Sequence, residues 1–167
     1  MADYEHMKRA KNSLGLKEVK GSKHSPIILG WLKAIGQGWV KDDETAWCGT
    51  FVAANVLGYG DPLPKNPLSA RAWLTYGVST VPQYGAVLVF WRGKVNGSLG
   101  HVGFYVGEDA TYFYVLGGNQ SDSVSITRMP KTRLLGARRP LNAPFPFTPW
   151  IVKGDPRTAA VTNGNEA

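Results

Sequence analysis

In the first half of the chain, apolar residues recur at intervals of three and four, which is the spacing of amphipathic helices. Helices are predicted over residues 3–16 and 68–76. Ser25 followed by Pro26 is a helix start signal, so a further helix is predicted from there to Gly36 or Gly38. Small and apolar residues at helical spacing also follow Cys48, which therefore opens another predicted helix.

The hydrophobic pattern changes after residue 85 to short runs of β-branched and aromatic residues. These runs are separated by short turns, which favour an antiparallel meander. Strands are predicted over residues 86–91, 101–106, 111–116, 124–127 and 133–137. Helices thus come first and strands second, so the predicted fold class is α+β, with N-terminal helices packed on a C-terminal antiparallel β-sheet.

The 167 residues are enough for one domain with a real core, which we expect to span residues 1–139. Beyond residue 139, five prolines between Pro140 and Pro156 exclude a regular helix or a central strand. Residues 140–167 are therefore predicted to form a proline-rich strap followed by a disordered tail.

The net charge, the single cysteine and the length of the apolar runs limit the kinds of function that the sequence suggests. A net charge of +7 favours anionic partners, such as nucleic acid, anionic membrane surfaces or cell wall polymers. A single cysteine excludes an intramolecular disulfide and argues against a structural zinc site. No apolar run reaches the roughly 18 residues that a membrane span needs, and the N-terminus has no apolar signal region. Synthesis in a cytoplasm without a signal peptide is therefore expected.

The candidate chemistry centres on Cys48. At a helix N-terminus, the thiolate form of a cysteine is favoured over the thiol, and the thiolate is the nucleophile. A lone cysteine can also be an unreactive residue of the hydrophobic core. His101 opens one predicted strand and Asn119 follows the end of the next. In an antiparallel pair these two residues become neighbours. Cys, His and Asn together can perform acyl transfer, with the thiolate as nucleophile, the imidazole as acid and base, and the amide orienting the ring.

Three motifs resemble one family. W-C-G-T-F-V around Cys48, G-H-V-G-F-Y-V around His101 and L-G-G-N-Q after the next strand resemble the NlpC-type and CHAP-type papain-like cell wall hydrolases, most of all their short phage-associated branch. The resemblance covers residues 14–138. It departs at Ala86, where the family usually has aspartate after the glycine.

This resemblance implies a peptidoglycan endopeptidase or amidase, with Cys48, His101 and Asn119 as its catalytic residues. Trp47, Trp91 and Gln120 are the candidate substrate-binding residues. No cofactor is expected, and no metal, since neither H-E-x-x-H nor a paired Cys/His spacing occurs. The expected role is that of a monomeric phage endolysin. It would be made in the bacterial host and would act at the cell wall after the membrane is permeabilised, without stable membrane association and without nucleic acid as a partner.

Two alternatives remain at the level of the sequence. A toxic amidase delivered between competing bacteria would have the same catalytic centre, and a neighbouring immunity protein would distinguish it. A basic nucleic-acid-binding module would leave Cys48 in the core and would need basic and aromatic residues interleaved on one surface. The basic residues between Arg128 and Arg139 have no aromatic residues interleaved with them in the sequence, which argues against that module.

Overall fold

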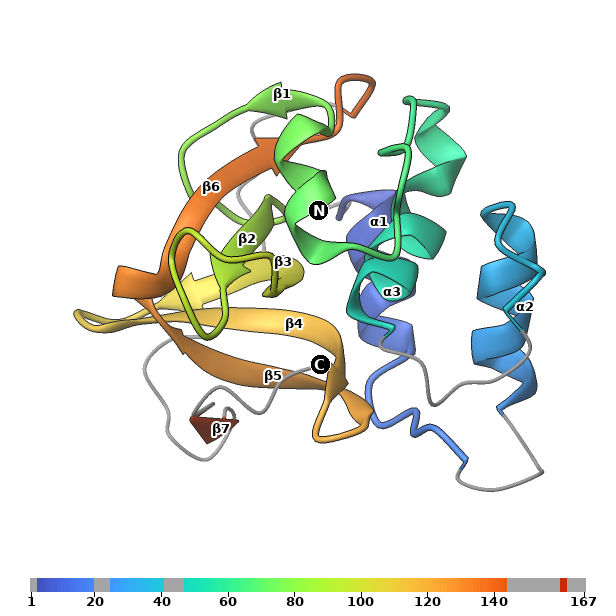
Figure 1. The fold of residues 1–167 in the computed structure, drawn as a ribbon, viewed down its shortest axis with the longest axis horizontal. Coiled ribbons are helices and arrows are strands. Elements are labelled where there is room, and N and C mark those ends of the chain that lie inside the picture. Colours follow the sequence, from blue (N-terminus) through green and yellow to red (C-terminus); the bar gives the residue numbers. More distant parts are fainter. Residues whose placement is uncertain (1–2, 20–24, 41–46, 144–159, 162–167) are drawn as a thin grey trace.

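The computed structural model describes residues 3–19, 25–40, 47–143 and 160–161. Within these residues, helices lie on one side of the molecule and a curled, mainly antiparallel sheet on the other (Figure 1). This arrangement confirms the predicted α+β class. The acidic residues 42–44 before the cysteine helix, and residues 144–159 and 162–167 of the predicted strap and tail, lie outside the described residues.

Three helices form where the apolar spacing predicts them, with shorter bounds. They are α1 (Glu5–Asn12), α2 (Pro26–Ala34) and α3 (Cys48–Val56). The Ser25 hydroxyl accepts a hydrogen bond from the Ile28 backbone N–H, which is the capping contact that the Ser-Pro pair predicts. The first helix ends early because residues 13–15 form a turn with Gly15 at φ +91°.

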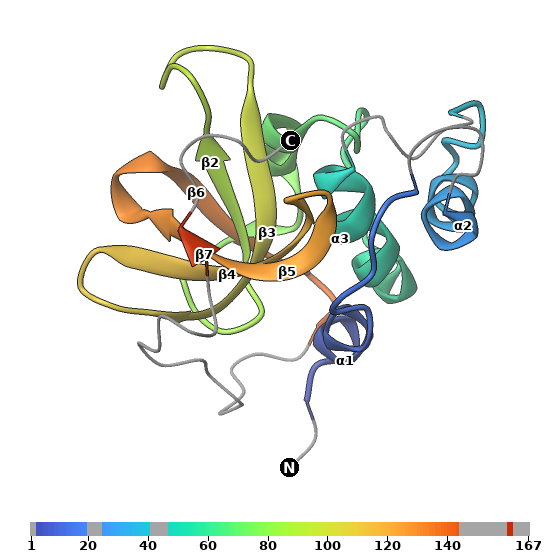
Figure 2. The same ribbon diagram turned by 90° about the horizontal axis from the view of Figure 1, so that it is seen from below.

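Helix α3 is the central helix. Both views place it between the sheet and α2 (Figures 1 and 2), and it contacts β3, β4, α1 and α2. Phe51 packs edge-on against Phe104 of the sheet and against Trp31 of α2. A helix that contacts neighbours on every side needs small and apolar residues all round. The sequence after Cys48 has this composition.

The helix predicted over residues 68–76 is a 3₁₀ helix, η2 (Ala70–Thr75). Its two buried residues, Ala70 and Trp73, are three residues apart, a spacing that suits three residues per turn as well as 3.6. The Trp73 indole N–H donates to the Pro67 carbonyl at 3.0 Å, which holds this segment against the residues before it.

The sheet contains seven strands within the described residues, in the order β1-β6-β2-β3-β4-β5-β7. Their bounds are β1 (Val78–Ser79), β2 (Val87–Trp91), β3 (Gly100–Glu108), β4 (Tyr112–Gln120), β5 (Ser123–Pro130), β6 (Leu134–Arg139) and β7 (Ala160–Val161). The predicted meander holds from β2 to β5. The next strand, β6, returns to pair with β2 instead of β5. In the segment predicted as a disordered tail, β7 pairs in parallel with β5.

Successive side chains of β3 pack on opposite faces of the sheet, because side chains alternate along a strand. Phe104 faces the helices and lies 5.9 Å from the Phe51 ring, measured between centroids. Tyr105 faces the other side, inside the curl of the sheet, where it meets Phe113 at 6.0 Å. Both faces of β3 are therefore covered, and its first eight residues are all buried.

Beyond β6, the chain is tied back to the body of the protein through Asp61. The Asn142 backbone N–H donates to the Asp61 carboxylate at 3.2 Å, and the Tyr76 hydroxyl donates to its other oxygen at 3.3 Å. The Asn142 amide also donates to the Tyr59 carbonyl. Among the described residues, no helix has the length and apolar character to cross a membrane.

A buried histidine fastens α1 to the turn before β2 and to Tyr59. The His6 ring is fully buried, with Nδ1 2.8 Å from the Tyr59 hydroxyl and Nε2 2.8 Å from the Gly85 carbonyl oxygen. A carbonyl can only accept, so Nε2 carries the proton and Nδ1 accepts from Tyr59. Burial lowers the pKa of His6 to about 4. The ring is therefore held neutral.

We expect this histidine to make stability depend on pH. The unfolded chain binds a proton at His6 below about pH 6.5, whereas the folded chain does so only near pH 4. The contribution is fully present above pH 6.5 and is lost as the pH falls towards 4, by about 3 kcal/mol in total. Urea unfolding of the wild type and of His6→Gln across this range measures it. In the variant, the free energy of unfolding should lose most of its dependence on pH between 6.5 and 4. An unchanged dependence would contradict the conclusion that the fold holds His6 neutral.

Candidate active site

Cys48 is the first residue of α3 and is 3% exposed. Burial by itself raises the pKa of the thiol. The hydrogen bond and the charge of His101, together with the backbone N–H groups of Val102 and Gly49, outweigh burial and leave the pKa of Cys48 below its usual value. The surroundings of this cysteine therefore favour the thiolate, as its place at a helix start predicts.

His101 is the second residue of β3 and is fully buried. Its Nε2 lies 2.8 Å from Oε1 of Gln120, the last residue of β4. The amide nitrogen of Gln120 donates to the Ser125 carbonyl at 2.7 Å and to the Val115 carbonyl at 3.3 Å, so the amide oxygen must point to the imidazole. Nε2 of His101 therefore carries the proton, and Nδ1 is the nitrogen left for the Cys48 thiol.

The residue bonded to the imidazole is Gln120, not Asn119 as the sequence predicts. Extending the β3–β4 register from the pair Phe104–Leu116 would place Asn119 opposite His101. The pairing of β4 with β5 instead shifts between Gly117 and Gln120, which inserts one extra residue into β4. Such a bulge turns the following side chain to the other face, so Gln120 occupies the place that Asn119 would have in a regular strand.

Asn119 has a structural place in this bulge. Its φ is +57°, in the left-handed region that asparagine tolerates better than most residues. Two glycines precede it, so the G-G-N sequence itself indicates irregular backbone at this point. This is the signal from which the role of Gln120 could have been inferred.

Gly117 and Gly118 give the site the space that it needs. A Cβ on Gly117 would lie 2.5 Å from Oε1 of Gln120 and 3.3 Å from Nε2 of His101. A Cβ on Gly118 would lie 2.7 Å from both Phe51 and the Trp47 ring. Any larger residue would push apart either the His101–Gln120 hydrogen bond or the contact of α3 with β4.

A pocket of about 160 Å³ opens at Cys48. Its other lining residues come from the start of η2, the end of β2 and the loop before β3: Leu68, Ser69, Ala70, Arg92, Ser98, Leu99 and Gly100. Gly49 lets this wall approach the helix, because a Cβ there would lie 2.1 Å from the Pro67 carbonyl oxygen. The pocket can hold a group about the size of one amino-acid residue next to the thiol.

The two tryptophans predicted to bind substrate lie elsewhere. Trp47 is 1% exposed, and its indole N–H donates to Glu18 at 3.1 Å. Trp91 ends β2, and its indole N–H donates to the Thr132 carbonyl. Neither lines the pocket at Cys48, although Arg92, the residue after Trp91, does.

Several basic residues do have aromatic neighbours, which the sequence does not reveal. The Arg128 guanidinium lies 5.4 Å from the Tyr112 ring, the Lys131 amine 5.3 Å from the Phe113 ring and the Arg133 guanidinium 5.7 Å from the Trp91 ring. These partners come from neighbouring strands. Phe113 and Arg133 are buried, so the pairs that they form are packing contacts.

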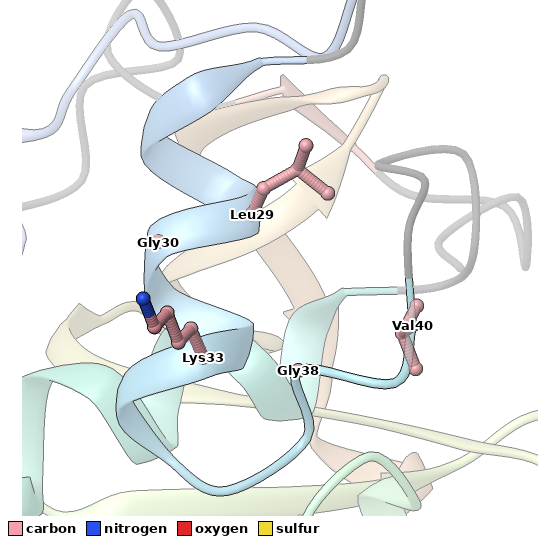
Figure 3. Close-up of a pocket in the computed structure, with 5 residues that line it drawn as sticks. All are labelled: Leu29, Gly30, Lys33, Gly38 and Val40. Carbon is pink, nitrogen blue, oxygen red and sulfur yellow. The ribbon is translucent and has the colours of Figure 1, made fainter.

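A second pocket of about 480 Å³ lies on α2 (Figure 3). It is lined by Leu29, Gly30 and Lys33 of the helix and by Gly38 and Val40 of the following loop. Among the described residues, none lines both this pocket and the one at Cys48, and the described lining of this pocket has no nucleophile paired with a base. Within the described part of the chain, no three His, Cys, Asp or Glu side chains are grouped so that they could hold a metal ion.

Compared with protein-family models and with curated protein sequences, the chain matches none.

We expect loss of the Gln120 amide to raise the pKa of Cys48, because the amide oxygen stabilises the protonated imidazole that faces the thiolate. The pH at which iodoacetamide alkylates the single cysteine should rise by about one unit in Gln120→Ala, the worth of one hydrogen bond. Asn119→Gly, which keeps the left-handed backbone, is the matched control and should leave this profile unchanged. A shift in the control alone would return the orienting role to Asn119.

Gly117→Ala should weaken the same hydrogen bond without removing either partner. We expect a loss of about 1–3 kcal/mol in the free energy of unfolding, together with the same upward shift in alkylation pH. Gly30→Ala on α2 is the control, since a Cβ there meets nothing within 4 Å and should be neutral or stabilising by up to about 1 kcal/mol. Equal behaviour of the two variants would show that the space at Gly117 is not required.

Proposed function

We propose that this chain is a cysteine hydrolase that cleaves an amide bond of bacterial peptidoglycan, with Cys48 as nucleophile, His101 as acid and base, and Gln120 as the residue that orients the ring. The observation that carries the proposal is the connected series of Cys48, His101 and Gln120, in which the Gln120 amide fixes the tautomer of the imidazole. A nucleophile, a base and an orienting group in this order form the general arrangement for acyl transfer.

The proposed fold is papain-like, of the NlpC and CHAP type. The resemblance of the sequence motifs supports it, as does the order of the elements, in which a cysteine opens a central helix and a histidine opens the neighbouring strand. The glutamine in the third position replaces the asparagine that the resemblance implies. Both side chains end in an amide, so the oxygen that accepts from the imidazole is chemically the same.

In the first half of the proposed reaction, the Cys48 thiolate attacks the carbonyl carbon of the substrate amide. In this proposal, backbone N–H groups at the start of α3, that of Cys48 included, stabilise the oxyanion that forms. Nδ1 of His101, which holds the thiol proton as imidazolium, donates it to the leaving amine. The C–N bond breaks, and the acyl group remains on Sγ as a thioester.

In the second half, the neutral imidazole accepts a proton from water, which attacks the thioester carbonyl. The C–S bond breaks, the carboxylic acid leaves and the thiolate–imidazolium pair is restored. The Gln120 hydrogen bond keeps the proton on Nε2 in the neutral ring, so that Nδ1 is the basic nitrogen when water attacks. General acid–base steps of this kind accelerate a reaction by about 10²- to 10⁴-fold.

The substrate class is supported by the sequence motifs and by charge. Cell wall polymers are anionic, and a net charge of +7 favours approach to them at low ionic strength. The proposed setting is lysis of the bacterial cell wall, in the manner of a phage endolysin.

The proposal predicts that wild-type protein releases soluble fragments from purified sacculi and that Cys48→Ala releases none. Mass spectrometry of the fragments identifies the bond that is cut. Cys48→Ala removes only one sulfur atom, so thermal unfolding of both proteins checks that the fold is retained. Equal inactivity of the two folded proteins on sacculi from several bacteria would refute a peptidoglycan hydrolase.

A further inference from the structure

We propose that Leu99 determines specificity at the Cys48 site by contacting an aliphatic side chain of the substrate beside the scissile amide, and that Arg71 holds Leu99 in position. This role deepens the proposed hydrolase function and rests on it for its biological meaning, but the contact itself can be measured without turnover. Leu99 belongs to the loop between β2 and β3 (residues 92–99), which no step of the proposed reaction uses.

The β2–β3 loop is exposed, yet its backbone is fixed. Residues 93–99 are all exposed. The Arg92 backbone N–H donates to the Leu99 carbonyl at 3.1 Å and closes the neck of the loop. Within the loop, the Gly97 backbone N–H donates to the Lys94 carbonyl, also at 3.1 Å. Backbone hydrogen bonds therefore define the shape of a loop whose side chains lie in solvent.

Arg71 of η2 binds this loop through three further hydrogen bonds. Its Nε donates to the Leu99 carbonyl at 2.8 Å, Nη1 to the Val95 carbonyl at 2.9 Å and Nη2 to the Lys94 carbonyl at 2.6 Å. The N–H donors of a guanidinium lie in one rigid plane, so three bonds from one side chain fix both the distance and the orientation of the loop relative to η2. The β2–β3 loop is therefore preorganised before any ligand binds.

The fixed loop presents an apolar side chain beside the candidate nucleophile. Leu99 lines the pocket that contains Cys48, and 54% of its surface is exposed. Leu68 and Ala70 add apolar groups to the same lining. A ligand that covers apolar surface gains binding free energy roughly in proportion to the area removed from water. A preorganised wall adds to the gain, because no loop has to be ordered on binding.

The size and chemistry of the pocket indicate the class of ligand. About 160 Å³ holds a group of the size of one amino-acid residue. An aliphatic side chain suits the wall formed by Leu68, Ala70 and Leu99, where a polar side chain would lose hydrogen bonds to water. The hydroxyls of Ser69 and Ser98 in the same lining can bond to the backbone of a peptide. The proposed ligand is therefore a peptide residue with an aliphatic side chain.

Two neutral alkylating agents test the contact without turnover. Iodoacetamide has no apolar group, and N-isobutyl iodoacetamide has a branched aliphatic group on the same amide. With either agent Cys48 Sγ attacks the methylene carbon, an S–C bond forms, the C–I bond breaks and iodide leaves with the electron pair. The chain has one cysteine, so the label reports on this site alone. The rate with the isobutyl agent divided by the rate with iodoacetamide, normalised to the same ratio for a small free thiol, measures the preference for an aliphatic group.

We expect the normalised ratio to be about 5 or more in the wild type and to fall to near 1 in Leu99→Ser, because the apolar contact is lost. This substitution keeps the carbonyl that Arg71 binds. Val95→Ser is the matched control. Val95 is 60% exposed on the same loop and also binds Arg71 through its carbonyl, but it is not among the described residues that line the pocket. The control should leave the ratio within about 2-fold.

Arg71→Met tests the positioning role, because methionine keeps much of the aliphatic stem and has no donor. The described lining of the pocket does not include Arg71, and both agents are neutral, so loss of its charge alone should not change the ratio. We expect the ratio to fall about 3-fold or more although Leu99 is intact, since the loop is no longer held. Arg71→Lys should retain part of the preference, because its amine can still donate to a carbonyl.

The outcomes separate the contact, the positioning role and the proposed function. Equal ratios in the wild type and Leu99→Ser overturn the contact, and so does an equal fall in Val95→Ser, which would show only a general effect of the loop. An unchanged ratio in Arg71→Met overturns the positioning role. The expected ratios with uncut sacculi would support the aliphatic contact and refute the peptidoglycan substrate. Cut sacculi with a wild-type ratio near 1 would refute the contact and leave the hydrolase.

Discussion

The seating of α3 on β3 and β4 is the packing contact on which the rest of the structure depends. Phe51 meets Phe104 on one strand, and Phe51 and Trp47 rest on the bare backbone of Gly118 on the next. Because the interior of a protein is close-packed, a single methyl group at Gly118 would lift the helix from the sheet. The same contact brings the start of α3 to the start of β3, where Cys48 meets His101.

Glycines allow this contact where the sequence would otherwise have side chains in the way. Gly49 admits the Pro67 backbone beside the helix start, and Gly117 leaves room for the His101–Gln120 hydrogen bond. Each glycine raises the conformational entropy that is lost on folding, a cost of roughly 0.5–1 kcal/mol relative to alanine. The gain is a buried hydrogen bond between His101 and Gln120, which keeps the imidazole in one orientation.

Two of the described histidines, both buried, illustrate how the environment assigns different roles to one side chain. His6 lies between the Tyr59 hydroxyl and the Gly85 carbonyl, and burial lowers its pKa to about 4, so it stays neutral and fastens α1 to the turn before β2. His101 is equally buried, but it faces a thiol that can give up its proton and an amide oxygen that stabilises the charged ring. What separates the two is the acidity of the partner: the pKa of Cys48 is lowered, whereas burial raises the pKa of the Tyr59 hydroxyl that faces His6.

The sequence by itself determined the helices α2 and α3 and the strands from β2 to β5, because these follow from local periodicity, a capping signal and strand alternation. It also singled out Cys48 and His101, through their places at the starts of predicted elements and through the resemblance of their motifs to one family. Only the tertiary structure decided that Gln120 takes the place predicted for Asn119, since a bulge reverses which face a side chain occupies and its position depends on pairing with β5. The return of β6 to β2, the burial of Trp47 and the presence of Arg92 beside Cys48 are likewise contacts between distant segments. Such contacts leave no periodic signal in the chain, because packing between elements selects them after the elements have formed.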